Sequence, residues 1–526
     1  MICIKILILT GTQSYSILKG VIQNIQTHQI EIVKVPVSIS AFITPQMVKD
    51  SINTRNLSGY DLILLPGFVQ WDSSELEEKF NIPIRKGPEF ASDLPMILKN
   101  LEVIDLSTNI PANQLFESSG TEQHKTLFKE MLEKAMYNIS TQTFFINQDK
   151  SDVMIGKELP PPIIAEIVNC PKKSNESILK KTTHYIESGA DIIDIGCIAN
   201  APNQDRVREI IKLIHNHFNI LISIDSMDSD EILAAVDEGI DMILSFDIGN
   251  YETFLDIPRD IPIVILPTNI NKGYFPRDPQ TRVQNLFDLT DKLQSHGFTK
   301  LIADPLLETP ISPGIINSLQ AYYLYTQISS KKQYKELKLP MFFGISNVVE
   351  LMDVDSVGIN GLLASIAAEL DMGILFTVEH STKMFGGVKE LKKSMMLNYL
   401  AKHKNTPPIN IGMQVFKAKG KTSQEIPDLP IENIVDVKGP NTHYRADEAG
   451  YFKIYVDHYK KRIFVLFYSN KNQFLNGFSG QKAEFLSKKI IELKLTTNLT
   501  HINYLGRELK KAEMCLKFAK PYIQDE

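Results

Sequence analysis

Most of the polar residues that could do chemistry share one position: they follow short apolar runs between residues 163 and 383. Two of them, Asp225 and Asp304, are carboxylates that close otherwise apolar runs. Burying a carboxylate there costs free energy unless something pairs with it. The other polar residues at such ends are Asn169, Cys170, Asp194, Cys197, Ser245, Asp247, Ser346, Asn347, Glu379, His380, Ser381 and Lys383. We therefore expect a ligand site here, with Asp225 and Asp304 in need of a partner.

Carboxylates and an amide at one site suit a flat ligand with a donor-rich edge. The 2-amino-4-oxo pyrimidine edge of a pterin is of this kind, because one carboxylate can accept its adjacent N–H groups together. This ligand requires no metal. A divalent cation held by Asp194, Asp225 and Asp304 is the alternative.

The apolar runs are the elements that must position these residues. Near-continuous apolar strands that alternate with helices are typical of a parallel sheet buried on both faces. Eight such units in one stretch predict a closed barrel with its site at the C-terminal ends of the strands. The runs begin at residues 163, 192, 220, 242, 261, 301, 341 and 374. The predicted fold class is α/β, with a central (β/α)8 TIM barrel.

Two further domains are expected on either side of the barrel. Residues 1–158 alternate short strands and helices, which predicts a Rossmann-like α/β domain followed by a helical linker. A proline cluster marks the start of the barrel, which we place at residues 159–405. Residues 406–526 begin with a linker rich in lysine and proline at 417–430 and continue as a hairpin and two helices. We expect a small α+β domain there.

Four segments of the barrel carry a family resemblance. They resemble the pterin-binding barrel shared by dihydropteroate synthases and corrinoid-linked methyltetrahydrofolate methyltransferases, and with the flanking segments the chain is similar to archaeal dihydropteroate synthase-related proteins. The resemblance implies a reduced pterin of the tetrahydromethanopterin or folate type as ligand. The segments are GADIIDIG at 189, ISIDS at 222, DPLLETPISP at 304 and GISNVVEL at 344.

The resemblance also implies roles for single residues. Asp225 and Asp304 match the strand-three and strand-six carboxylates that bind the pterin, and Asn347 matches the amide that contacts its reduced ring. The family's strand-four Asn is absent, so Ser245 or Asp247 takes that contact. Asn169 completes the pterin-binding set that we expect.

The loops differ from those of a dihydropteroate synthase. VNCPKKS, SNVV and TVEHSTK stand where that enzyme carries a glycine-rich loop, a strand-seven Lys and a strand-eight Arg. Lys172, Lys173 and Lys383 are the cations that could replace them. We expect Asn347, Lys383 and Glu379 as catalytic residues and Ser381 and Lys383 at the second substrate, with no resident metal but Mg²⁺ if that substrate is a diphosphate.

The resulting expectation is a pterin-utilising transferase of coenzyme biosynthesis or one-carbon metabolism. One alternative is transfer of a methyl group from a methylated tetrahydropterin to a corrinoid or thiol acceptor; another is a non-catalytic pterin-binding subunit. No D-x-H-x-x-G motif occurs, so no bound corrinoid is expected, and a corrinoid or one-carbon protein would be a partner. Homodimer formation follows by analogy.

Composition narrows the setting. The net charge of −6 gives no general attraction to nucleic acid. No apolar run reaches the roughly 18 residues of a membrane span, and four cysteines in 526 residues form no disulfide framework. We expect a cytoplasmic protein that binds neither nucleic acid nor membrane.

Overall fold

The computed structural model describes residues 3–23, 25, 27–102, 104–199, 201–409, 411–415 and 447–525. The chain divides into two compact units, Met1–Met131 with Met396–Asn433, and Leu132–Met395 with Ile434–Glu526. None of the described helices combines the length and the apolar character needed to cross a bilayer. The linker expected at 417–430 lies outside the described residues.

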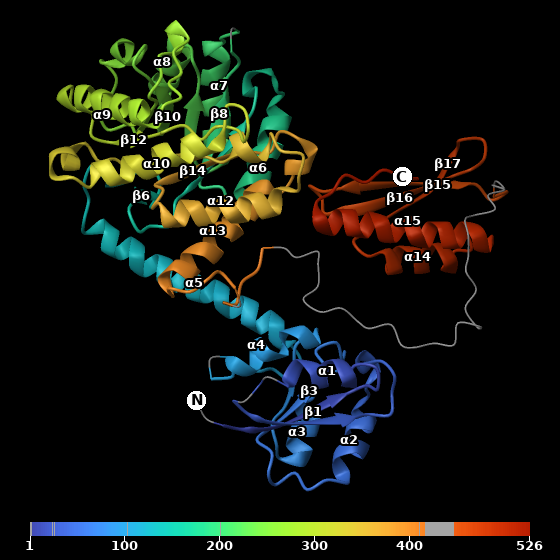
Figure 1. The fold of residues 1–526 in the computed structure, drawn as a ribbon. Coiled ribbons are helices and arrows are strands. Elements are labelled where there is room, and N and C mark those ends of the chain that lie inside the picture. The colour runs from blue at the N-terminus through green and yellow to red at the C-terminus, as the bar shows by residue number, and fades with distance from the viewer. Residues whose placement is uncertain are drawn as a thin grey trace. The chain divides into compact units, whose positions relative to one another are not determined.

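A parallel sheet of four strands, in the order β2-β1-β3-β4, forms the centre of the first unit (Figure 1). Its apolar residues alternate between two faces: Leu7 and Leu9 of β1 pack with residues of α2 and α3, whereas Ile6 and Ile8 pack with residues of α1 and α4. Helices therefore cover both faces, as in the expected Rossmann-like domain. The elements are β1 (Lys5–Thr10), α1 (Tyr15–Ile22), β2 (Gln29–Lys34), α2 (Pro45–Asn53), β3 (Leu62–Leu65), α3 (Ser74–Phe80), β4 (Ile84–Lys86), α4 (Leu94–Lys99) and α5 (Ala112–Met136).

Eight parallel strands form the sheet of the second unit, in the order β12-β11-β10-β9-β8-β7-β14-β13. Ala303 at the end of β12 also pairs in parallel with Met341, which precedes β13, so the sheet closes on itself. Each strand lies within an apolar run that predicted it, and the expected barrel is confirmed. The strands are β7 (Ile163–Ile167), β8 (Ile192–Gly196), β9 (Leu221–Asp225), β10 (Met242–Phe246), β11 (Ile263–Ile265), β12 (Leu301–Ala303), β13 (Phe342–Gly344) and β14 (Ile374–Val378).

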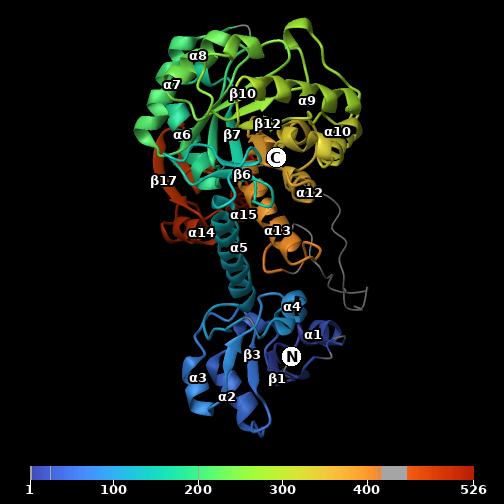
Figure 2. The same cartoon turned by 90° about the vertical axis from the view of Figure 1, so that its left-hand side faces the viewer.

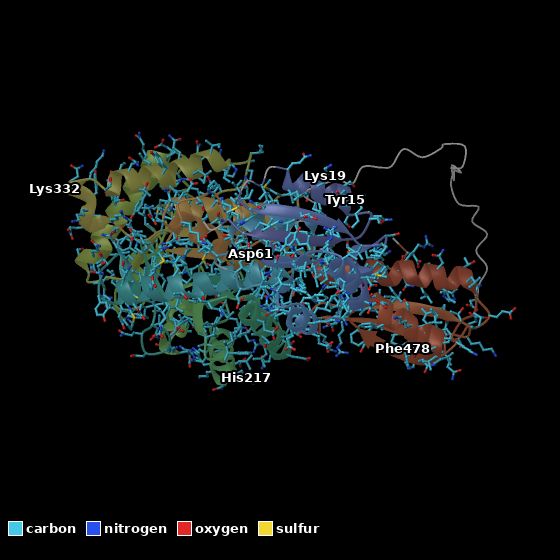
Figure 3. The ribbon with its side chains drawn as sticks, turned by 90° about the horizontal axis from the view of Figure 1, so that it is seen from below. Tyr15, Lys19, Asp61, His217, Lys332 and Phe478 are labelled. Atoms are coloured by element: carbon cyan, nitrogen blue, oxygen red, sulfur yellow. The ribbon has the colours of Figure 1, made fainter. Side chains whose placement is uncertain are left out.

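Helices surround these strands (Figure 2). Polar side chains on the outer surface, such as His217 at the end of α7 and Lys332 in the short helix after α10, are exposed (Figure 3). The connection from β10 to β11 departs from the rule of one α-helix per strand, because it carries only the 3-10 helix η4 (Tyr251–Phe254). The α-helices are α6 (Asn175–Ser188), α7 (Gln204–His217), α8 (Ser229–Asp237), α9 (Pro279–Ser295), α10 (Ile315–Ser329), α11 (Ser346–Val349), α12 (Ser356–Glu369) and α13 (Gly387–His403).

The barrel interior changes from apolar to polar along the strands. Ile164, Ile192 and Leu221 belong to one apolar core, which Phe144 and Ile155 of the hairpin β5 (Thr143–Phe145) and β6 (Met154–Gly156) also enter. Side chains two residues apart in a strand share a face. The next inward positions toward the C-terminal ends therefore carry the polar residues Glu166, Asp194, Ser223 and Asp225.

A three-stranded antiparallel sheet with two helices forms the C-terminal part of the second unit. The hairpin and both helices were expected; the third strand was not. The side-chain amide of Gln524 lies along the edge strand β15, where its Oε1 accepts from Ile454 N and its Nε2 donates to Phe452 O, both at 2.9 Å. The elements are β15 (Tyr451–Asp457), β16 (Arg462–Tyr468), β17 (Phe474–Gly480), α14 (Ala483–Glu492) and α15 (Leu499–Phe518).

Candidate functional site

A cavity of about 270 Å³ opens at the C-terminal ends of the barrel strands. Its walls combine apolar side chains from the barrel interior with polar groups from strand ends and loops. Among the predicted site residues, Asp225, Ser245, Asp247, Asp304 and Asn347 line it. The remaining lining residues are Ser226, Met227, Leu244, Asn250, Val264, Leu266, Ile270, Asn271, Leu306, Phe342, Gly344 and Phe376.

Asp304 follows β12 and is 7% exposed. Its Oδ1 accepts hydrogen bonds from the Tyr322 hydroxyl and from Leu306 N, each at 2.8 Å. Burial raises the pKa of Asp304 to about 6, although these two hydrogen bonds oppose the shift. Since Oδ1 is already engaged, Oδ2 is the oxygen left for a ligand.

Asp225 ends β9 and belongs both to the cavity wall and to a cluster of carboxylates. Oxygens of Glu166, Asp194 and Asp225 lie within 4.8 Å of one another. Burial raises the pKa of Asp225 to about 6, and burial together with the charge of Asp225 raises the pKa of Glu166 to about 8. The trio expected for a cation, Asp194 with Asp225 and Asp304, is not the group that the fold assembles, because Glu166 stands in place of Asp304.

Asp247 lines the cavity but has its acceptors filled by the polypeptide. Its Oδ1 accepts from Gly249 N and Asn250 N, and its Oδ2 accepts from Ile270 N and the Thr268 hydroxyl. These bonds fix the loop after β10. Ser245 is partly exposed in the wall, and its carbonyl accepts from Asn250 Nδ2 at 3.4 Å.

Asn347 lies in α11, just after β13, and is exposed at the cavity. Its Nδ2 donates to Leu307 O at 2.9 Å, which ties the amide to the loop that follows Asp304. The carbonyl oxygen of the amide remains for a ligand, together with the second hydrogen of Nδ2. This amide and Asp304 therefore reach the same cavity from neighbouring strands.

The other predicted residues do not line this cavity. Glu379 is buried against α6, where it accepts from His184 Nε2 at 2.8 Å and pairs with Lys181 at 3.4 Å. Burial would raise the pKa of Glu379, but these partners hold it below its ordinary value. Lys383 Nζ donates to the carbonyls of Val349 and Met352. Asn169 is exposed after β7, and Ser381 N donates to Glu350.

Three residues of the site were missed by sequence reasoning. Glu166 could have been found, because it is a lone carboxylate inside an apolar run. Asn250 lies in the loop after β10 and lines the cavity, where its Oδ1 accepts from Asp247 N and its Nδ2 donates to Ser245 O. Tyr322 comes from α10 and gave no signal, since only packing directs its hydroxyl at Asp304.

The cavity is acidic. Of the residues that the structure describes, those that line it include three Asp and no Lys, Arg or His. A ligand that offers hydrogen-bond donors, or a cation, complements such walls, whereas an unaccompanied diphosphate does not.

Comparison with known proteins agrees with this geometry. The sequence model described as "Pterin binding enzyme" matches residues 169–369, which contain every residue that lines the cavity except Phe376. An uncharacterized protein of Methanocaldococcus jannaschii is 32% identical over 99% of this chain and 98% of its own. The chain belongs to the pterin-binding enzyme family. Two other models match outside the barrel: a family of unknown function at residues 4–89, and PterinBD-DUF4346 at residues 446–525.

Solved structures of dihydropteroate synthases are similar to the chain at lower identity. A dihydropteroate synthase of Xanthomonas albilineans, bound to indole-2-carboxylic acid and 6-chloroguanine, is 17% identical, with a TM-score of 0.39 and coverage of 51% of this chain and 100% of that one. The 7,8-dihydropteroate synthase of Vibrio fischeri is 22% identical, with a TM-score of 0.34 and coverage of 47% and 94%.

Proposed function

We propose that this pterin-binding family member is a transferase that acts on a reduced pterin held in the barrel cavity. The observation that carries the proposal is Asp304, a buried carboxylate with Oδ1 fixed by Tyr322 and Leu306 N and Oδ2 left over. The 2-amino group and the neighbouring ring N–H of a pterin form a pair of donors that such a carboxylate accepts.

The rest of the cavity suits a flat bicyclic ring. Val264, Leu266, Phe342 and Phe376 provide apolar walls, and its volume of about 270 Å³ is close to the lower end of small-ligand pockets. Asn347 supplies a neutral amide beside the ring. We propose a pterin of the folate or tetrahydromethanopterin type, acting in one-carbon metabolism or in synthesis of such a coenzyme.

Two transfers are compatible with this pterin. The first resembles the reaction of a dihydropteroate synthase: an aryl amine displaces diphosphate from the pterin. The charge of the diphosphate must then be neutralised by a group other than the described residues that line the cavity. In the second, a methyl group moves from a methylated tetrahydropterin to a corrinoid or thiol acceptor on a partner. The absence of cationic side chains among the described lining residues favours this second candidate.

The test of the pterin site is anaerobic calorimetric titration with tetrahydrofolate and tetrahydromethanopterin. Asp304→Asn keeps the shape of the side chain and removes its charge, so we expect affinity to fall by about 10- to 100-fold, the worth of a hydrogen bond to a charged group. A 2,4-dioxo pteridine, with a carbonyl in place of the amino donor, serves as the matched ligand and should bind the wild type weakly. Equal affinity of wild type and variant for both ligands would refute the assignment of Asp304.

Activity assays then separate the two transfers. Diphosphate release that depends on an aryl amine would establish the synthase-like reaction. Methylation of a corrinoid protein or a thiol by a methylated tetrahydropterin would establish the other. Tight pterin binding without either reaction would leave a binding subunit.

A further inference from the structure

Three carboxylates, one buried and two partly buried, lie beside the pterin cavity, and no ion pair among the described residues neutralises them. Glu166 and Asp194 occupy adjacent register positions on β7 and β8, and Asp225 ends β9 next to them. Their oxygens lie within 4.8 Å of one another. None of the ion pairs among the described residues includes any of the three. Like charges this close are not stable together in a buried site unless a cation or protons join them.

A second observation comes from Asp194, which is 0% exposed. Its Oδ1 accepts a hydrogen bond from the Ser223 hydroxyl at 2.6 Å, but its equally buried Oδ2 has no hydrogen-bond partner. An unsatisfied buried carboxylate oxygen costs free energy, and native structures rarely leave one without a ligand.

Gly196 provides the room for this arrangement. A Cβ at this position would lie 2.1 Å from Glu166 Oε1, so the carboxylate fills the space that a side chain would take. Gly196 is the register partner of Asp225. The Glu166 carboxylate, packed on Gly196, therefore lies next to the end of β9. Glu166 and Asp225 are only partly buried, which leaves access from the mouth.

We propose that Glu166, Asp194 and Asp225 bind one divalent cation at the edge of the pterin cavity. Three carboxylates offer only hard oxygen ligands, which suit Mg²⁺ or Mn²⁺ rather than a metal that prefers thiolate or imidazole. Water or an anionic group of a second substrate completes the coordination. The cation then supplies the positive charge that the described cavity walls lack. This proposal goes beyond pterin binding and stands without it.

The experiment measures Mn²⁺ binding to the metal-stripped full-length chain with no pterin present. Calorimetry and the electron paramagnetic resonance signal of free Mn²⁺ are the two readouts. We expect one saturable site per chain. Asp194→Asn and Glu166→Gln should each weaken it by about tenfold or more, since even indirect changes at metal sites cost that much. Asp304→Asn is the matched control, because Asp304 lines the same cavity outside the trio, and it should bind Mn²⁺ as wild type does.

Thermal unfolding shows whether each variant is folded, and Mn²⁺ should raise the unfolding temperature of wild type and Asp304→Asn but not of the other two. The proposal is overturned if wild type shows no saturable site, or if either folded variant, Asp194→Asn or Glu166→Gln, binds Mn²⁺ like wild type. Equal loss in Asp304→Asn would also overturn this choice of ligands. Because the probe is Mn²⁺ alone, failure here leaves the pterin proposal intact.

Discussion

At the scale of single residues, Tyr322 sets the direction of the Asp304 carboxylate. Its hydroxyl donates to Asp304 Oδ1 at 2.8 Å and lies 3.0 Å from Phe342 O. Loss of one hydrogen bond from a neutral hydroxyl typically costs about 0.5–1.5 kcal/mol of free energy. We therefore expect Tyr322→Phe to weaken pterin binding by about 2- to 10-fold, measured by calorimetry.

A neighbouring tyrosine provides the matched control for this change. Tyr325 is equally buried in α10, but its hydroxyl meets Leu337 O and Leu339 N, away from the cavity. Tyr325→Phe should leave pterin affinity unchanged. If both variants lose affinity alike, helix packing rather than the bond to Asp304 is responsible.

The pH dependence of pterin binding follows from the same carboxylate. Burial raises the pKa of Asp304 to about 6, and only the ionised form accepts two donors. Affinity should be constant well above pH 6 and fall by about tenfold for each unit well below it, more steeply if Asp225 must also be ionised. Calorimetry across this range measures the slope. A flat profile in wild type would contradict this role.

Tyr322→Phe should also move this midpoint. The Tyr322 hydrogen bond lowers the pKa of Asp304, so its loss raises that pKa further. The fall in pterin affinity should therefore begin at a higher pH in this variant than in wild type. In Asp304→Asn, the part of the fall in pterin affinity with decreasing pH that is caused by protonation of Asp304 should be absent.

At the scale of elements, Glu379 joins the end of β14 to α6. It is 7% exposed and accepts from His184, Lys181 and Val388 N. We expect Glu379→Gln to lower the free energy of unfolding by about 2 kcal/mol, since hydrogen bonds to charged groups are lost, and to leave pterin affinity unchanged. Thermal unfolding and calorimetry measure the two effects, with the exposed Glu369→Gln as control. Lost affinity without lost stability would favour the catalytic role that the sequence suggested.

The strands of the barrel could be predicted because parallel strands buried on both faces are apolar throughout. Strands β4 and β17 escaped prediction because one is only Ile84–Lys86 and the other, Phe474–Gly480, is mostly exposed and without alternation. Asp225 and Asp304 could be placed since strand ends meet at one mouth. Glu379 and Lys383 also follow a strand, but they turn outward toward helices, and sequence does not fix that direction.

At the scale of the whole molecule, we propose the three domains expected from sequence: residues 1–158, 159–405 and 406–526. Three separate family matches, one in each range, support these domains. The second and third domains nevertheless belong largely to one compact unit of the structure. The cavity lining lies entirely between Asp225 and Phe376. None of residues 1–105 lines it, so their removal should change pterin affinity by less than about twofold.

Calorimetry of the shortened chain measures this effect against full-length protein. Circular dichroism should confirm that the barrel stays folded, since its interior core includes no residue before Phe144. A large loss of affinity in a folded barrel would show that the first domain contributes to the site.

The amide of Gln524 protects an exposed sheet edge against pairing with other molecules. By pairing with Ile454 N and Phe452 O, one side chain imitates the peptide group of an additional strand. Part of an otherwise open sheet edge is thereby unable to pair with the β-strand of another molecule, which is how edge strands start aggregation. Gln524→Ala should leave the barrel untouched yet make the protein more prone to associate on concentration, an effect that light scattering would register.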